Sequence, residues 1–163
     1  MYILDTNFLI AINNDMSETA CEEILSILLK LANQDYLKIP EEVIGELNQK
    51  KDKLSEWAQR NKKELIVKTD NILNLIPIVL DKYKEGKNNF SLDSLDLLEK
   101  RADPYIIAHA LKLNATVVSD EIPCKSGDYK LQDPKNRKIP DICGALGISY
   151  IKNLQFLWYI SKL

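Results

Sequence analysis

The sequence MYILDTNFLI, residues 1–10, contains the segment that decides the fold. Residues 2–4 form a short apolar run without a turn residue, which predicts a buried β-strand. The strand ends at Asp5, where a carboxylate is costly to desolvate unless a cation or hydrogen bonds compensate its charge. Because ligands of open α/β sheets bind at the carboxyl ends of strands, Asp5 is the first candidate functional residue. The alternative is that Asp5 only caps the turn after the strand.

Length and composition indicate one domain over residues 1–163. Hydrophobic residues make up 45% and charged residues 28%, which is ordinary globular usage. No run approaches the ~18 apolar residues of a membrane span, and no basic segment precedes an apolar one as in a signal peptide. The three cysteines and one histidine form neither a zinc pattern nor a disulfide framework. We therefore expect a cytoplasmic protein without a membrane partner.

The charge pattern excludes a globally basic nucleic-acid binder, because the net charge is −2. Basic residues are nevertheless concentrated in residues 50–63 and again in residues 125–138. These clusters line either a path for phosphates or solvated surface. The pattern remains compatible with a nuclease.

Apolar periodicity and capping residues predict alternating strands and helices. Further strands are expected at residues 36–39, 115–118 and 148–151, and residues 65–68 form a strand or a connector. Helices are expected to start at Ser17 and to span residues 41–61, 70–85 with a kink or division at Pro77, 105–114 and 142–146. Residues 91–99 form a short helix or turn, 122–138 a long loop, and Asn153 caps a terminal helix that packs deeply or joins a second subunit.

This alternation predicts a three-layer α/β/α fold. Strands that alternate with helices form a mostly parallel central sheet with helices on both faces. The first strand is expected to be the central one, which would place Asp5 in the middle of the sheet edge.

Acidic residues recur at positions that such a fold brings to one edge. Asp5 follows the first strand, Glu46 borders the apolar face of a helix, and Asp103 precedes Pro104 at a helix start. Asp120 and Glu121 follow the strand at residues 115–118. Each has a local explanation, such as helix capping by Asp103 or an ion pair of Glu46 with the residue four positions later. Together they would repel one another, and a hard divalent cation such as Mg²⁺ or Mn²⁺ would relieve that repulsion.

These segments also resemble the PIN-domain family. The resemblance rests on Ile3-Leu4-Asp5-Thr6-Asn7, on Glu46, on Ala102-Asp103-Pro104 with the helix that follows, and on Val117-Val118-Ser119-Asp120-Glu121. PIN domains are metal-dependent ribonucleases, and many small bacterial and archaeal members are VapC-like toxins of toxin–antitoxin pairs. The resemblance therefore implies an RNA substrate, Mg²⁺ or Mn²⁺ as cofactor, and a small antitoxin protein as partner.

The resemblance also assigns roles to residues. It implies Asp5, Glu46, Asp103 and Glu121 as the four catalytic acids, with Asp120 as the alternative to Glu121. Asp5, Asp103 and Glu121 would be direct metal ligands, and Glu46 would act directly, through water or on the attacking water. Thr6, Asn7 and Ser119 match the small polar residues that support the metal site.

Several features set the chain apart from the smallest toxins. The segment between Glu46 and Asp103 and the loop after Glu121 are both longer, and residues 138–143 resemble an uncharacterised PIN-like subgroup. Two other functions stay open: a PIN-like module that binds RNA or protein with weak or no cleavage, and a phosphatase with Asp5 as nucleophile. The phosphatase pattern requires a second Asp two residues after the first, where this chain has Asn7. A homodimer through the terminal helix is also open.

Other reactive residue types have simpler explanations. His109 is expected to serve packing or to lie on the surface, and Asp141 to cap its helix. Cys124 and Cys143 lack a histidine partner in the sequence pattern and are not expected to be nucleophiles.

Overall fold

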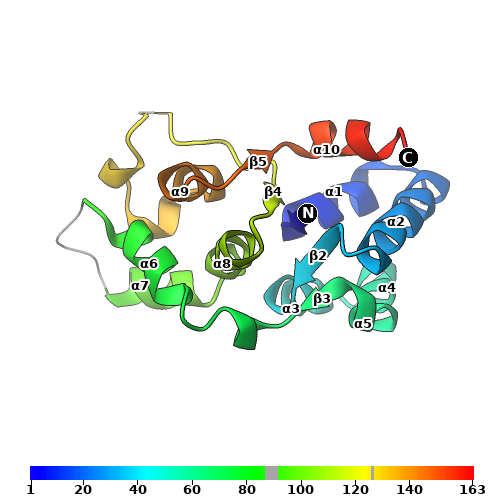
Figure 1. The fold of residues 1–163 in the computed structure, drawn as a ribbon, viewed down its shortest axis with the longest axis horizontal. Helices are drawn as coiled ribbons and strands as arrows, with labels where there is room; N and C mark the ends of the chain where they lie inside the picture. The colour runs from blue at the N-terminus through cyan, green and yellow to red at the C-terminus, as the bar shows by residue number, and fades with distance from the viewer. Residues whose placement is uncertain (87–91, 126) are drawn as a thin grey trace.

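The fold is a five-stranded, all-parallel sheet between two layers of helices (Figure 1). The computed structural model describes residues 1–86, 92–125 and 127–163. The strands are β1 (Tyr2–Leu4), β2 (Leu37–Pro40), β3 (Ile66–Val67), β4 (Thr116–Val118) and β5 (Tyr150–Ile151). Their order is β3-β2-β1-β4-β5, so the three-layer α/β/α prediction and the central place of the first strand are confirmed.

The sheet order reverses beside β1, and this position matters for binding. β1 pairs with β2 on one side, with Tyr2 opposite Leu37, and with β4 on the other, with Leu4 opposite Val118. The carboxyl ends of β1 and β4 therefore lie side by side. In parallel sheets a crevice forms at this kind of switch point.

One helical layer consists of α8 (Asp103–Leu113) with α6 (Ile76–Lys84) and α9 (Ile139–Leu146) beside it, and α7 (Leu92–Glu99) lies farther out (Figure 1). The opposite layer contains α1 (Thr6–Asp15), α2 (Glu18–Asn33) and α10 (Asn153–Ile160). In this second layer the ring of Phe156 lies 4.8 Å from that of Tyr2 and 5.3 Å from that of Phe8. Those ring contacts attach the last helix to the first strand.

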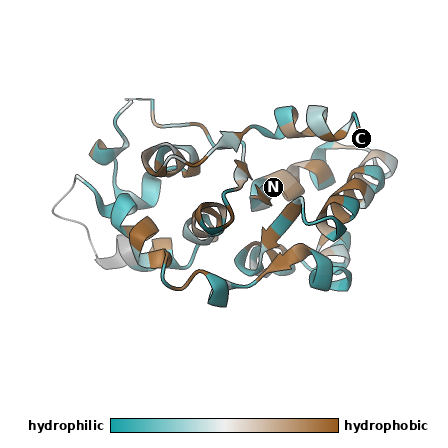
Figure 2. Ribbon diagram, in the orientation of Figure 1, coloured by the Kyte–Doolittle hydropathy of each residue, from teal (hydrophilic) through white to brown (hydrophobic). Residues whose placement is uncertain are grey.

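The apolar core follows the strands and the inner helix faces, as the hydropathy colouring shows (Figure 2). Ile3, Leu37 and Val117 of three adjacent strands are fully buried. Ile106 and Ile107 of α8 are fully buried as well. Helix α8 is therefore fixed against the centre of the sheet, and Asp103 at its first residue is held in place.

Helix α1 was missed by the sequence analysis. It begins at Thr6, directly after Asp5, with no loop between strand and helix. Its buried residues Phe8, Leu9 and Ile12 follow helical spacing, which was the available signal.

The predicted helix over residues 41–61 is wrong in its continuity. The chain forms α3 (Glu41–Asn48) and α4 (Lys53–Arg60), separated by Lys51 with a positive φ of 50°. Asp52 explains the restart, because its carboxylate accepts the N–H of Ser55 at 3.0 Å and caps α4. A short helix, α5 (Lys62–Leu65), then leads into β3.

The helix predicted at residues 70–85 starts later than expected. Residues Thr69–Asn71 form a 3₁₀ turn, η1, and α6 begins at Ile76. Pro77 lies in the first turn of α6, where its missing N–H costs nothing, so it divides the segment. Helix α7 covers 92–99, and the predicted start at residue 91 lies outside the described residues.

Three helix starts also differ from their predictions. Helix α8 begins at Asp103, two residues before the predicted range, and α9 begins at Ile139, three residues before its predicted range. Lys152, not Asn153, is the N-cap of α10. Between β4 and α9 the chain is a long loop with two 3₁₀ turns, η2 (Tyr129–Leu131) and η3 (Pro134–Asn136). This confirms the predicted loop within the residues described.

Helix α10 packs through one face only. Phe156 and Ile160 are buried, but Leu154, Trp158 and Tyr159 are 77%, 55% and 48% exposed. Deep packing of the whole helix is therefore wrong, and a homodimer through this face stays a prediction. Within the described residues, no helix combines the length and apolar character needed to cross a membrane.

Candidate active site

A cavity of about 450 Å³ opens where β1 and β4 end. It is lined by Asp5, Thr6, Asn7, Ile10, Glu46, Gln49, Lys50, Lys100, Arg101, Asp103 and Glu121. The four acids that the sequence singled out are all in this set, although they come from four separate segments of the chain. The predicted convergence at one sheet edge is therefore confirmed.

Asp5 lies on the floor of the cavity and is only 3% exposed. Its Oδ2 atom accepts hydrogen bonds from the hydroxyl of Ser119 at 2.7 Å and from the side-chain amide of Asn7 at 3.1 Å. The pKa of Asp5 is raised to about 6. Burial is the main cause, and the negative charge of Glu121 contributes, whereas the hydrogen bonds from Ser119 and Asn7 lower the pKa by less. Both of its side-chain donors are neutral, so its negative charge is only partly compensated.

Asp103 is the first residue of α8 and lines the same cavity as Asp5. Its nearest cation is Arg101, with Nη1 3.8 Å from Oδ2, among the residues described. The pKa of Asp103 is raised to about 7, chiefly by burial and also by the negative charges of Glu121, Asp5 and Glu46. Asp103 therefore lies in a negative field that Arg101 and the helix N-terminus only partly offset.

Glu46 connects three helices. It accepts hydrogen bonds from the hydroxyl of Thr6 through Oε2 and from the backbone N–H of Ala102 through Oε1, the latter at 3.1 Å. These partners belong to the start of α1 and to the residue before α8. Glu46 is therefore oriented by its neighbours, and the predicted surface ion pair with Lys50 is not among its described contacts.

The two acids after β4 point to different places. Glu121 lines the cavity, whereas Asp120 accepts the backbone N–H of Asn153 at 2.9 Å, at the start of α10. The buried hydroxyl of Ser119 accepts the N–H of Glu121 at 3.2 Å and so links Glu121 to Asp5. Of the two alternatives, Glu121 is the acid that joins the site.

Glu121 also has a partner that the sequence did not predict. Its Oε1 lies 3.1 Å from the ammonium group of Lys138, and its Oε2 accepts the N–H of Ile139 at 2.7 Å. Both oxygens of Glu121 are thus engaged by the start of α9. Asp141 caps this start, as predicted, and also accepts the N–H of Cys124.

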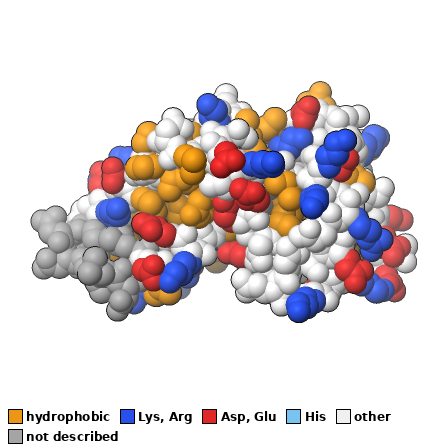
Figure 3. Space-filling view, turned by 90° about the horizontal axis from the view of Figure 1, so that it is seen from below, with side chains coloured by type: hydrophobic (Ala, Val, Ile, Leu, Met, Phe, Trp, Pro, Cys, Tyr) orange, Lys and Arg blue, Asp and Glu red, His pale blue; other side chains and the backbone are white. Residues whose placement is uncertain are grey.

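Basic side chains border the acidic floor. Lys50, Lys100 and Arg101 are exposed and line the cavity. Lys50 belongs to a basic cluster noted in the sequence, but Lys100 and Arg101 were missed although they directly precede the Ala102-Asp103-Pro104 motif. On the face seen from below, one group of Asp and Glu side chains lies near the middle beside basic side chains, and further acidic and basic side chains are spread over both ends (Figure 3). The positive charge available to phosphates is therefore confined to a few side chains at the cavity, which is consistent with a net charge of −2 for the whole chain.

The second predicted basic cluster has another role. Arg137 is 1% exposed, and its guanidinium donates to the carbonyls of Gln132, Lys130, Lys82 and Tyr83. The prediction that this cluster lies on the solvated surface is therefore wrong for Arg137. Its hydrogen bonds fasten the loop before α9 to helix α6.

Other reactive residue types do not contribute to the cavity. His109 is fully buried in α8, and burial lowers its pKa to about 4. Burial also raises the pKa of the Cys143 thiol to about 12. Of the two positions predicted for His109, packing is therefore the one observed, and the un-ionised Cys143 thiol agrees with the prediction that it is not a nucleophile.

The acids do not form a closed metal cage. In the parts of the chain that the structure describes, no three His, Cys, Asp or Glu side chains are close enough to hold an ion jointly. The arrangement can therefore offer one or two carboxylates to a cation and leave the remaining positions to water and phosphate. Mg²⁺ is commonly bound in that way.

Comparison with known proteins places the chain in a family. No curated protein and no solved structure matches it. The family model described as "Domain of unknown function (DUF4411)" matches residues 2–160, which covers every segment of the sheet and the site. The chain is a member of the DUF4411 family.

Proposed function

We propose that this protein is a Mg²⁺- or Mn²⁺-dependent endoribonuclease of the PIN type, which hydrolyses phosphodiester bonds in RNA. The observation that carries the proposal is the meeting of Asp5, Glu46, Asp103 and Glu121 around one cavity at the switch point of a parallel sheet. These are the residues that the resemblance assigned as the four catalytic acids. The basic side chains at the border supply the complementary contact for a nucleic acid.

The donor set fits a hard divalent cation. It contains only oxygen donors, and burial is the main cause that raises the pKa values of Asp5 and Asp103, an effect that a bound cation would offset. Asp5 and Asp103 would hold the ion. The resemblance implies Glu121 as a third ligand, but both of its oxygens already have partners at the start of α9. When bound, such an ion polarises a phosphate oxygen and lowers the pKa of a water molecule.

The chain's own residues would perform the remaining tasks. Ser119 and Asn7 keep the Asp5 carboxylate oriented through their hydrogen bonds. Glu46, fixed by Thr6 and the N–H of Ala102, is placed to orient a water molecule or to accept its proton.

The basic residues at the border have a separate task. Lys50, Lys100 and Arg101 would contact phosphates on either side of the cleaved bond. Such contacts fix the position of an RNA strand without reading its bases.

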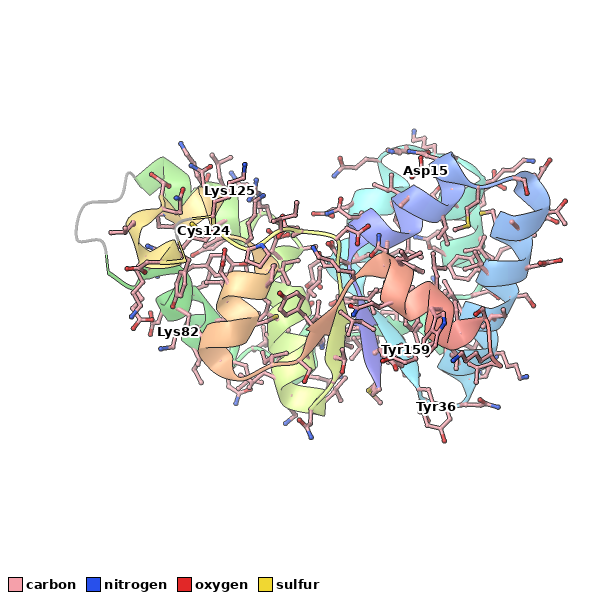
Figure 4. All side chains as sticks on the ribbon, turned by 90° about the horizontal axis from the view of Figure 1, so that it is seen from above. Asp15, Tyr36, Lys82, Cys124, Lys125 and Tyr159 are labelled. Atoms are coloured by element: carbon pink, nitrogen blue, oxygen red, sulfur yellow. The ribbon has the colours of Figure 1, made fainter. Side chains whose placement is uncertain are left out.

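The direct test is RNA cleavage by matched variants. Purified protein would be incubated with fluorescently labelled single-stranded and hairpin RNAs in MnCl₂ or MgCl₂, and with EDTA. We expect cleavage by the wild type that EDTA abolishes, and none by Asp5→Asn or Asp103→Asn. Asp15→Asn is the control, because it makes the same change at the exposed far end of α1 (Figure 4). Equal cleavage by all four proteins would exclude this active site.

The main competing function is a binding module that does not cleave. It would be supported if the wild type binds RNA in a gel-shift assay and leaves every RNA intact in both metals. Loss of RNA binding in Lys100→Ala or Arg101→Ala would then still place the RNA at this cavity.

The biological role proposed with the activity is that of a toxin restrained by a small antitoxin. Inducible expression in a bacterial host should arrest growth with the wild type and not with Asp5→Asn. Relief of arrest by co-expression of a small protein encoded beside the gene would identify the antitoxin. Arrest of equal strength by both proteins would contradict a toxin role based on cleavage.

A further inference from the structure

Among the described acids of the cavity, Glu121 has the closest cation. The Lys138 ammonium lies 3.1 Å from its Oε1, and the N–H of Ile139 lies 2.7 Å from its Oε2. Ile139 is the first residue of α9, so this N–H is at the positive end of the helix. Glu121 thus carries two positive partners, one on each oxygen.

The charges of Asp5 and Asp103 are less fully compensated. Asp5 accepts hydrogen bonds from the neutral Ser119 and Asn7 side chains, and the Arg101 guanidinium is 3.8 Å from Asp103. Arg101 is also engaged elsewhere, since its Nη1 donates to the carbonyl of Lys135 at 2.9 Å. Positive charge is therefore needed on the Asp5–Asp103 side of the cavity and is already present on the Glu121 side.

The backbone of Lys138 is held in place by hydrogen bonds at the start of α9. It is the N-cap of α9, and its own N–H lies 3.4 Å from Oδ2 of Asp141, which also accepts the N–H of Cys124. The preceding residue is the buried Arg137, whose guanidinium is fastened to backbone carbonyls of α6 and of the loop. Two anchors on consecutive residues keep the Lys138 side chain directed at Glu121, although that side chain is 42% exposed.

We infer that Lys138 is a built-in cation that replaces a second metal ion, so that the site binds one divalent cation at Asp5 and Asp103 while Glu121 stays paired with Lys138. The inference rests on the proposed metal-dependent function and specifies how that site is divided. Glu121 then acts as a positioning residue, which joins the start of α9 to Ser119 and Asp5. A long aliphatic stem with a terminal ammonium suits this role because it spans the distance and brings one charge.

The number of bound ions tests the inference without any measurement of cleavage. Metal-free full-length protein would be titrated with MnCl₂ by isothermal calorimetry, and free Mn²⁺ would be counted by electron paramagnetic resonance. We expect one ion in the wild type, one in Glu121→Gln with an affinity within about threefold of wild type, and none in Asp103→Asn.

Variants of Lys138 supply the second half of the test. Lys138→Met removes the charge and keeps the length, so Glu121 should gain a second Mn²⁺ or bind the single ion at least about tenfold more tightly. Lys138→Arg should restore the behaviour of the wild type. Lys125→Met is the matched control, because Lys125 is an exposed lysine of the same loop beside Cys124 (Figure 4).

The outcomes separate this inference from the proposed function. Two ions in the wild type, loss of the ion in Glu121→Gln, or a Lys138→Met protein that binds one ion with unchanged affinity would each overturn the role of Lys138 and leave the metal site in place. A wild type that binds no Mn²⁺ would overturn both. Circular dichroism of each variant would confirm that the fold is kept.

Discussion

Replacing Asp103 with Asn should stabilise the metal-free protein, and the gain should depend on pH. The pKa of Asp103 is raised from its ordinary value of 3.8 to about 7, chiefly because the carboxyl group is buried. Between these two pH values the folded chain keeps a proton that the unfolded chain releases. The unfolded state then binds fewer protons, so stability falls as pH rises through this window.

The magnitude follows from the difference between the two pKa values. Three pH units correspond to roughly 4 kcal/mol of destabilisation once the carboxylate is ionised in both states. The side chain is 18% exposed, and water screening makes this an upper figure. We therefore expect the gain in the free energy of unfolding of Asp103→Asn over wild type to be roughly 2–3 kcal/mol larger at about pH 8 than at about pH 5.

Urea denaturation in EDTA at both pH values, followed by circular dichroism, would measure this difference. Asp15→Asn serves as the control, since its exposed side chain predicts a difference near zero. The reasoning would be refuted if Asp103→Asn were less stable than wild type at about pH 8, or if both proteins showed the same pH dependence. Added MnCl₂ should reverse the order, because an ion that binds only the folded wild type stabilises it.

Three further predictions concern the support of the site and the core. Ser119→Ala removes the 2.7 Å donor to Asp5 and should cost about 1–3 kcal/mol at neutral pH, measured by urea denaturation, whereas no loss would show that Asp5 does not depend on this bond. Ile107→Ala creates a cavity at a fully buried position of α8 and should cost about 2–5 kcal/mol, and a thermal melt unchanged from wild type would contradict the packing described. Gly147→Ala places a Cβ at φ 69° after α9 and should cost about 1 kcal/mol in the same thermal assay, with the exposed helical Gly45→Ala as a control expected not to destabilise.

Local chemistry made much of the fold predictable. The first strand, the Ser17 cap and the helix end at residue 146 depend on a few neighbouring residues, and each was found where the sequence placed it. The errors in helix boundaries also have local causes, which the apolar periodicity alone did not reveal. Asp52 caps a new helix and interrupts residues 41–61, and Phe8, Leu9 and Ile12 belong to a helix that follows Asp5 without a loop.

The sequence by itself determined which acids could meet, because strand ends and helix starts of a parallel sheet share one edge. Only the tertiary structure decided between Asp120 and Glu121, since Asp120 accepts the N–H of Asn153 at the start of α10 whereas Glu121 lines the cavity. It alone also brought Lys138 to Glu121, across seventeen positions of loop. The charge that each carboxylate meets depends on chain segments far apart in sequence, and their distance is set by the packing of the loop on α6 and not by any local preference.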